Sequence, residues 1–348
     1  MIDSKRRAVA WWLIAGIIMI VIEFIMGGVT RLTGSGLSIT EWKPIMGFIP
    51  PLNEADWNKA FDGYKNIAQY KYVNSHFTLP DFKFIFYWEW AHRLWARMLG
   101  VVFAIGFVYF FVKKYFDKGM VRPFIILFIL GGLQGFVGWK MVASGLNDTD
   151  LYVKHTWLAA HFLSAITLMC YTLWFALVLL IPADRRVAAP AMVRQLVAII
   201  LLTYVQLAYG AFMAGTHASR AVHTWPRIAD EWVPGTLGSE SMVTNVMNIQ
   251  FVHRTLAYLL LIIIVVWYVW AGKAARRMGS VLLHKARRWP FVIVMLQVVL
   301  GVVTLISASQ IVFGTFGFYE TLAEIHQLVG MFLVMALVAN LYIISKKK

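Results

Sequence analysis

Eight long apolar segments alternate with polar segments along the chain, and each is long enough to cross a membrane. Crossing about 30 Å of hydrocarbon takes roughly 20 helical residues, and a helix pairs every backbone polar group internally. The segments lie between Arg7 and Arg31, from Ile85 to Val112, from Pro123 to Val142, between Lys154 and Asp184, from Gln195 to Thr216, from Val246 to Ala271, from Trp289 to Phe313 and from Glu320 to Ser345. The pattern predicts an all-α integral membrane protein with eight transmembrane helices.

Composition and charge agree with this class. Of the 348 residues, 60% are hydrophobic and only 14% are charged. The net charge of +15 would suit nucleic acid, but the basic residues are unevenly placed. The two terminal segments and the 2–3, 4–5 and 6–7 connections hold 19 Lys and Arg against 3 acids, and the other connections hold 10 against 11. The positive-inside rule therefore places both termini in the cytoplasm, and we expect no nucleic-acid partner. The seven residues before the first apolar run are too few for a mitochondrial transit peptide, so we expect a bacterial plasma (inner) membrane, with a mature organellar chain as the alternative.

The longest outer connection, residues 31–83, contains a predicted surface helix. Asn53 is placed to cap this helix, with Asp56 three residues later as its reciprocal partner. One face of the helix carries Trp57, Phe61, Tyr64 and Ala68. Two interpretations fit equally: a small lid resting on the membrane surface, or a cover over a site that opens outward.

Short motifs recur in successive spans at nearly constant offsets, which indicates an internal duplication. Residues 89–93 (EWAHR) correspond to residues 250–254 (QFVHR), 161 positions later. Residues 134–138 (QGFVG) correspond to residues 297–301 (QVVLG), and His161 corresponds to His326. The chain is therefore predicted to form two duplicated four-helix bundles, residues 1–187 and residues 188–348.

Four of the nine histidines occupy the even-numbered spans, about two turns from the outer end: His92, His161, His253 and His326. Because all even spans run in the same direction, these side chains are expected to form one layer, two in each half. One intramembrane histidine is often only hydrogen-bonded to its neighbours, whereas four at one depth favour a binding site. The remaining five are interpreted as loop or boundary residues, with His217 and His223 kept as candidate ligands of a metal on the outer face.

Two imidazoles in each half favour haem over zinc. A catalytic zinc ion usually needs three protein ligands, whereas haem iron accepts two axial ligands. Arg93 and Arg254 directly follow two of the histidines and are candidate partners of haem propionates. The alternative for both arginines is snorkelling towards the interface or pairing with a carboxylate.

The two halves differ one turn before the first histidine of each pair. Glu89 precedes His92 by three residues, and Gln250 takes the corresponding place before His253. A carboxylate inside a membrane helix is costly unless it has a partner or a function. The difference predicts acid–base or cation-stabilising chemistry in the first half only. The alternative is that Glu89 merely pairs with Arg93.

Together these residues resemble the haem A synthase family. The resemblance rests on EWAHR at 89–93, His161, FVHR at 251–254, EIHQ at 324–327, GGVTRLT at 27–33 and FKFIF at 82–86. It extends over nearly the whole chain. Some members carry a cysteine pair in their outer loops. Here the single cysteine, Cys170, lies in an apolar span, so the chain is similar to the cysteine-free branch.

The resemblance implies an oxidoreductase that oxidises the C8 methyl group of haem O to a formyl group, giving haem A for terminal cytochrome oxidases. It implies that His253 and His326 ligate a haem b, and that His92 and His161 bind the substrate haem. Glu89 matches the family's catalytic carboxylate, which stabilises positive charge at the reacting carbon. The expected partners are haem O, haem O synthase, cytochrome oxidase assembly factors and membrane lipid, with a homo-oligomer left open.

Two other functions remain open at this point. A di-haem b cytochrome would pass electrons to or from quinone and would need no special carboxylate. A transporter built from repeats would show broken helices near the membrane midplane, and the spans here are mostly unbroken.

Overall fold

The computed structural model describes residues 3–42, 46–311 and 316–346, and the chain is an all-α protein, as predicted. The eight expected membrane-spanning helices are present. They are α1 (Ser4–Leu32), α4 (Leu79–Val112), α5 (Val121–Ala143), α6 (His155–Leu180), α7 (Pro190–Gly215), α9 (Val246–Arg277), α11 (Arg288–Ser307) and α12 (Phe318–Ile344). Short elements connect them: α2 (Glu54–Lys65), α3 (Ala68–Tyr72), α8 (Ala218–Ala221), α10 (Val281–Ala286) and the 3-10 turns η1 (Met46–Phe48), η2 (Ala183–Arg185) and η3 (Ala308–Gln310). The predicted end of the seventh span, Phe313, lies outside the described residues.

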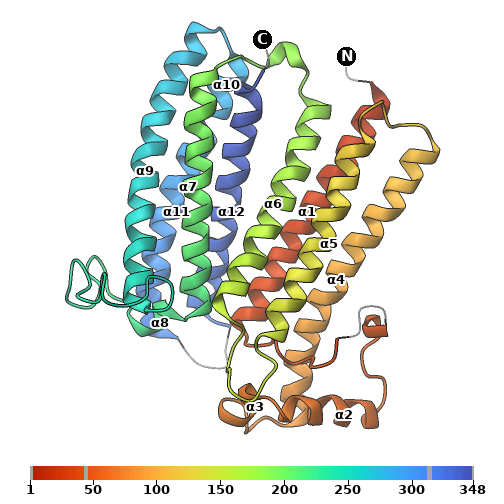
Figure 1. The fold of residues 1–348 in the computed structure, drawn as a ribbon, viewed down its shortest axis with the longest axis vertical. Helices are drawn as coiled ribbons and strands as arrows, with labels where there is room; N and C mark the ends of the chain where they lie inside the picture. Colours follow the sequence, from red (N-terminus) through yellow and green to blue (C-terminus); the bar gives the residue numbers. More distant parts are fainter. Residues whose placement is uncertain (1–2, 43–45, 312–315, 347–348) are drawn as a thin grey trace.

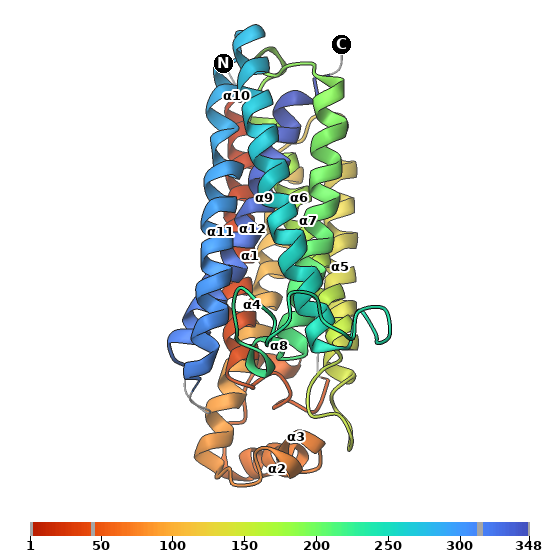
Figure 2. The same cartoon turned by 90° about the vertical axis from the view of Figure 1, so that its left-hand side faces the viewer.

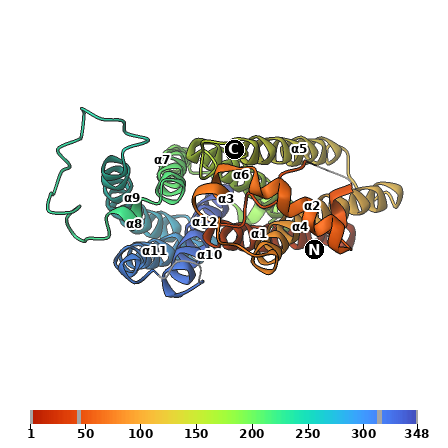
Figure 3. The same cartoon turned by 90° about the horizontal axis from the view of Figure 1, so that it is seen from below.

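The spanning helices form two side-by-side groups (Figure 1). Helices α1, α4, α5 and α6 make the first group, and α7, α9, α11 and α12 make the second. The groups meet where α6 packs on α7 and α12, and where α1 packs on α12. Viewed along the helices, the molecule is elongated in the direction that joins the two groups (Figure 3). Both termini lie at one end, and α2, α3 and α8 lie at the other (Figure 2).

Several helix starts are fixed by local side chains. The Asp3 side chain accepts a hydrogen bond from the Lys5 amide and caps α1. Thr78 and Asp81 form a reciprocal capping box at the start of α4. The Asn245 side chain caps α9 by accepting from the two amides that follow in its first turn. These caps satisfy backbone amides that have no partner inside the helix.

Aromatic packing joins the helices of the first group near the end that carries the termini. The Trp12 ring on α1 stacks on Phe103 of α4, with centroids 5.2 Å apart and planes within 9°. Gly106 makes this approach feasible, because a Cβ atom at this position would lie 2.3 Å from the Trp12 ring. Phe124 of α5 closes the cluster against Trp12 and Phe103.

The predicted surface helix is confirmed as α2, but it ends at Lys65, so Ala68 begins the separate helix α3 and does not belong to the same helix face. Asn53 caps it by accepting from the Asp56 amide at 2.9 Å, and the Asn53 amide group donates back to the Asp56 carboxylate. Its apolar face buries Trp57, Phe61 and Tyr64 against the first turns of α4. Lys71 of α3 pairs with Asp148 at 2.9 Å, and this ion pair links α3 to the loop between α5 and α6. Helices α2 and α3, which we call the lid, lie at the end of the first group opposite the chain termini (Figure 2).

Candidate functional site

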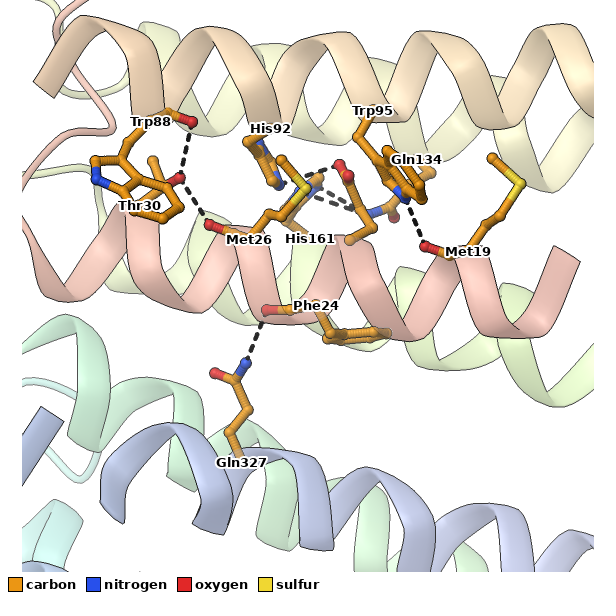
Figure 4. A network of polar contacts seen from close by, with 11 residues as sticks. Met19, Phe24, Met26, Thr30, Trp88, His92, Trp95, Gln134, His161 and Gln327 are labelled. Carbon is orange, nitrogen blue, oxygen red and sulfur yellow. Dashed lines mark hydrogen bonds and ion pairs between the residues drawn. The ribbon is translucent and has the colours of Figure 1, made fainter. Parts of the chain in front are cut away.

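The first pair of histidines lies between α1, α4, α5 and α6. His92 on α4 faces α1, where its Nε2 atom lies 3.1 Å from Oε1 of Glu23. A Cβ atom on Gly27, one turn further along α1, would approach the same Nε2 atom to 3.0 Å. His161 on α6 approaches the same space from the opposite side (Figure 4).

His161 has an equivalent pair of neighbours on α5. Its Nδ1 atom lies 3.2 Å from Nε2 of Gln134, and a Cβ atom on Gly138 would come within 2.8 Å of its ring. Ser164 donates a hydrogen bond to Oε1 of Gln134 and so fixes the orientation of that amide. The glycine provides space for the ring, and the glutamine positions it.

The second pair repeats this arrangement between α7, α9, α11 and α12. His253 Nδ1 lies 3.2 Å from Nε2 of Gln206 on α7, and His326 Nε2 lies 3.4 Å from Nε2 of Gln297 on α11. The centroids of the two imidazole rings are 6.5 Å apart, and the ring planes are inclined by 74°. Two metal–nitrogen bonds of about 2 Å each, plus about 1 Å from each nitrogen to its ring centroid, add up to about 6 Å, which matches this separation.

All four histidines share one local pattern. Each ring lies against a glycine, and a glutamine or glutamate precedes that glycine by four residues on the neighbouring helix. The four pairs are Glu23 and Gly27, Gln134 and Gly138, Gln206 and Gly210, and Gln297 and Gly301. The repeated motifs at 134–138 and 297–301 predict the glutamine–glycine pairs on α5 and α11, but they do not predict that Glu23 and Gln206 contact histidines. A glutamate or glutamine four residues before a glycine is the sequence signal that identifies both residues.

The residues around the histidines fit a flat group with two axial positions. Several buried polar atoms at these sites have no partner: Oε2 of Glu23, Oε1 of Gln206, Oε1 of Gln297 and Nδ1 of His326. No group of three or more metal-ligating side chains occurs within residues 3–42, 46–311 and 316–346. Two imidazoles, small residues beside them and unsatisfied polar atoms are the features expected where haem would bind.

The glycine contact predicts a steric effect on binding. In Gly301→Leu, the new side chain would enter the space of the His326 ring, because even a Cβ atom lies 3.0 Å from it. We expect the variant to lose at least half of the haem bound in the second group, measured by the Soret absorbance per chain. Gly131→Leu on α5 is the matched control, because nothing lies within 4 Å of a Cβ atom there. Equal haem content in both variants would contradict the assignment.

Glu89 is buried, at 2% exposure, and both of its oxygens have partners. One oxygen accepts hydrogen bonds from Oγ of Ser38 at 2.7 Å and from the Ile39 amide at 2.8 Å, and the other pairs with Arg93. The ion pair weighed as an alternative from the sequence is therefore present. Glu89 also links the segment that contains Ser38 and Ile39 to α4, which the sequence alone does not predict.

Gln250 fastens the second group in a complementary way. Its amide nitrogen donates to the carbonyl oxygens of Ala218 at 2.7 Å and Val222 at 2.8 Å, and its oxygen accepts from Arg254. The outer connection offers hydrogen-bond donors in the first group and acceptors in the second. The change from glutamate to glutamine matches this difference.

Arg93 and Arg254, the candidate propionate partners, also contact the outer connections. Arg93 donates to the carbonyl oxygen of Ile39 at 3.2 Å in addition to its pair with Glu89. Arg254 donates to the carbonyl oxygen of Arg227, while its Nε atom is buried without a partner. Each guanidinium group thus contacts a connecting segment: the one between α1 and α2 for Arg93, and the one between α8 and α9 for Arg254.

Glu324 lies at the contact between the two groups. It is buried on α12, two residues before His326, and its carboxylate lies so close to Gly28 of α1 that a side chain at position 28 would displace it. Neither oxygen has a hydrogen-bond partner. The Glu324 carboxylate therefore faces α1 of the first group.

The outer-face histidines do not converge on a metal site. His217 adopts a left-handed backbone conformation, and its ring contacts Tyr152 at 4.5 Å. Burial and the charges of Arg31 and Arg220 lower the pKa of His217 to about 3, so the ring is neutral at physiological pH. His223 is exposed, and neither residue joins a group of three metal-ligating side chains in the part of the chain that the structure describes.

Comparison with known proteins identifies the family of the chain. Residues 10–338, which include all four histidines, match the COX15-CtaA family, described as cytochrome oxidase assembly proteins. The chain is similar to the haem A synthase of Parvibaculum lavamentivorans, with 41% identity over 78% of this chain and 79% of the relative. The haem A synthases of Bradyrhizobium diazoefficiens (39%, over 89% of this chain and 86% of the relative) and Flavobacterium johnsoniae (35%, over 99% of both chains) are also similar.

Proposed function

Because the chain belongs to the COX15-CtaA family of cytochrome oxidase assembly proteins, we propose that it is an oxidoreductase that makes haem A. The reaction is oxidation of the C8 methyl group of haem O to a formyl group. The observation that carries the proposal is the pair of His253 and His326 rings, 6.5 Å apart, together with a similar pattern in the first group, where each histidine lies against a glycine and a glutamine or glutamate. The two groups are proposed to be duplicated halves, residues 1–187 and 188–348.

The two halves hold haem for different purposes in this proposal. His253 and His326 would hold a resident haem b, and this haem would supply one-electron transfer when bound. His92 and His161 would bind haem O as the substrate. Gln134 orients the His161 ring, and the glycine beside each histidine leaves room for its imidazole ring.

The residues at the outer end of the first half would control the reacting edge of the substrate. Glu89 is the proposed catalytic carboxylate, and its negative charge would stabilise positive charge that develops at the methyl carbon. Ser38, Ile39 and Arg93 hold the carboxylate in place. Arg93 and Arg254 are proposed to meet propionates of the two haems, which charge complementarity favours. The aromatic lid on α2 would limit access of water to the site.

The proposed reaction is tested in bacterial cells that make haem O but no haem A. Expression of this chain should produce haem A, detected by extraction of the membranes and chromatography of the haems. An expressed His92→Ala variant should produce none, because the substrate loses one of its two axial ligands. Additional haem b without haem A would support a di-haem cytochrome, and an unchanged haem composition would support a transporter.

Location and partners complete the proposal. The proposed location is a bacterial plasma membrane. The charge distribution favours an orientation with both termini in the cytoplasm, so a reporter enzyme active only in the cytoplasm should be active when fused to Lys348. An active periplasm-specific reporter at the same position would reverse the topology. The proposed partners are haem O synthase as the source of substrate and the assembly machinery of cytochrome oxidase as the recipient of product.

A further inference from the structure

The carboxylate of Glu23 is the one acidic group in direct contact with a histidine ring among the four described sites. Its Oε1 atom lies 3.1 Å from Nε2 of His92, and its Oε2 atom is buried without a partner. The residue lies in the membrane-spanning part of α1, four residues before the glycine that contacts the same ring. An ionisable side chain at such a position is costly and is a candidate for function.

The second half has an amide in the same place. Gln206 lies four residues before Gly210 on α7 and contacts His253, as Glu23 lies four residues before Gly27 and contacts His92. Gln134 and Gln297 show that an amide also suffices at the other two rings. Orientation of an imidazole ring therefore does not explain why Glu23 is a carboxylate.

The other difference between the halves has a local explanation, whereas this one has none. Glu89 accepts hydrogen bonds from Ser38 and Ile39, and Gln250 donates to carbonyl groups, so each matches its own outer connection. Among the described residues, the Glu23 carboxyl group contacts the imidazole, and its second oxygen has no hydrogen-bond partner. What distinguishes it from Gln206 is a carboxyl group, which can carry a negative charge beside the proposed haem site.

We propose that Glu23 sets the reduction potential of the haem held in the first half, which rests on the proposed function in that each half holds a haem. A negative charge in a low-dielectric interior stabilises the ferric iron more than the ferrous iron, because the ferric form carries one more positive charge. The first-half haem would then be harder to reduce than the same haem with an amide in place of the carboxylate. Positive charge that develops on the bound substrate would be stabilised by the same carboxylate.

The proposal predicts opposite effects for two reciprocal substitutions. In Glu23→Gln, the ferric-to-ferrous equilibrium of the first-half haem should shift at least tenfold towards ferrous, which is about 59 mV for a one-electron couple. In Gln206→Glu, the equilibrium of the second-half haem should shift towards ferric by a similar factor. Each variant should leave the other haem unchanged.

A mediated redox titration of the purified, haem-loaded protein, followed by absorption spectroscopy, measures both shifts. Loading the first half with haem A separates the two signals, because the conjugated formyl group moves its bands to longer wavelength than those of haem b. Glu23→Asp is the conservative variant, and it should retain a potential close to that of the unsubstituted protein.

The outcomes separate this inference from the proposed function. Unchanged potentials in both reciprocal variants, with two haems bound, would overturn the role of Glu23 and leave the proposed function intact. If Glu23→Gln retains no haem in its first half, the Gln206→Glu result decides alone. A wild-type protein with no haem in the first half would instead overturn the proposed function, and the role of Glu23 with it.

Discussion

Substitution of His253 by alanine is expected to remove haem b from the protein. The ring of His253 faces that of His326 across 6.5 Å, and no third metal-ligating side chain joins them in the described part of the chain. Loss of one ring would leave the iron with a single protein ligand. We expect the haem b content per purified chain to fall at least tenfold, measured by extraction and chromatography, while the protein still reaches the membrane.

The matched control is His223→Ala. His223 belongs to the same half but is exposed on the outer connection, so its loss should leave the haem b content unchanged. Normal haem b in the His253→Ala variant would show that the histidine pair on α9 and α12 does not bind this haem.

The second large effect is expected from Glu89→Gln. The substitution removes the negative charge proposed to act at the reacting methyl group but keeps the size and one acceptor oxygen of the side chain. Removal of one acid–base group typically lowers a rate by about 10²–10⁴-fold. The variant should therefore retain haem b and accumulate haem O or a partly oxidised product, measured by chromatography of the extracted haems.

A structural role of Glu89 must be separated from a chemical one, because its carboxylate also holds the outer connection. Ser38→Ala removes one of these hydrogen bonds and keeps the charge. We expect this variant to form haem A at no less than about half the normal rate. If Ser38→Ala were as impaired as Glu89→Gln, fastening of the loop would explain both effects. Unimpaired haem A formation in Glu89→Gln would remove Glu89 from the mechanism.

The spanning helices and the histidine layer were predictable because their signals are local. Hydropathy over about 20 residues identifies a span, and the cap at Asn53 together with the apolar face that follows it identifies α2. The four histidines stood out because a repeated polar residue in an apolar span is rare.

Contacts between helices were not predictable to the same extent. The bond from Ser38 to Glu89 joins residues 51 positions apart and depends on how the outer connection returns to α4. The position of Glu23 against His92 depends on which face of α1 meets α4, and apolar residues on all sides of a membrane helix conceal that face. A search for glutamate or glutamine four residues before glycine would have found it, whereas the contact of Glu324 with Gly28 has no comparable signal.

The number and type of haems per chain test the central claim most directly: one haem bound by an imidazole pair in each half. Protein purified from cells that supply haem O should contain two haems per chain, one haem b and one haem O or haem A, after extraction and chromatography. His253→Ala should lose only haem b, and His92→Ala should lose only haem O and haem A. One haem per chain shared between both pairs, or haem b alone at both, would contradict the claim.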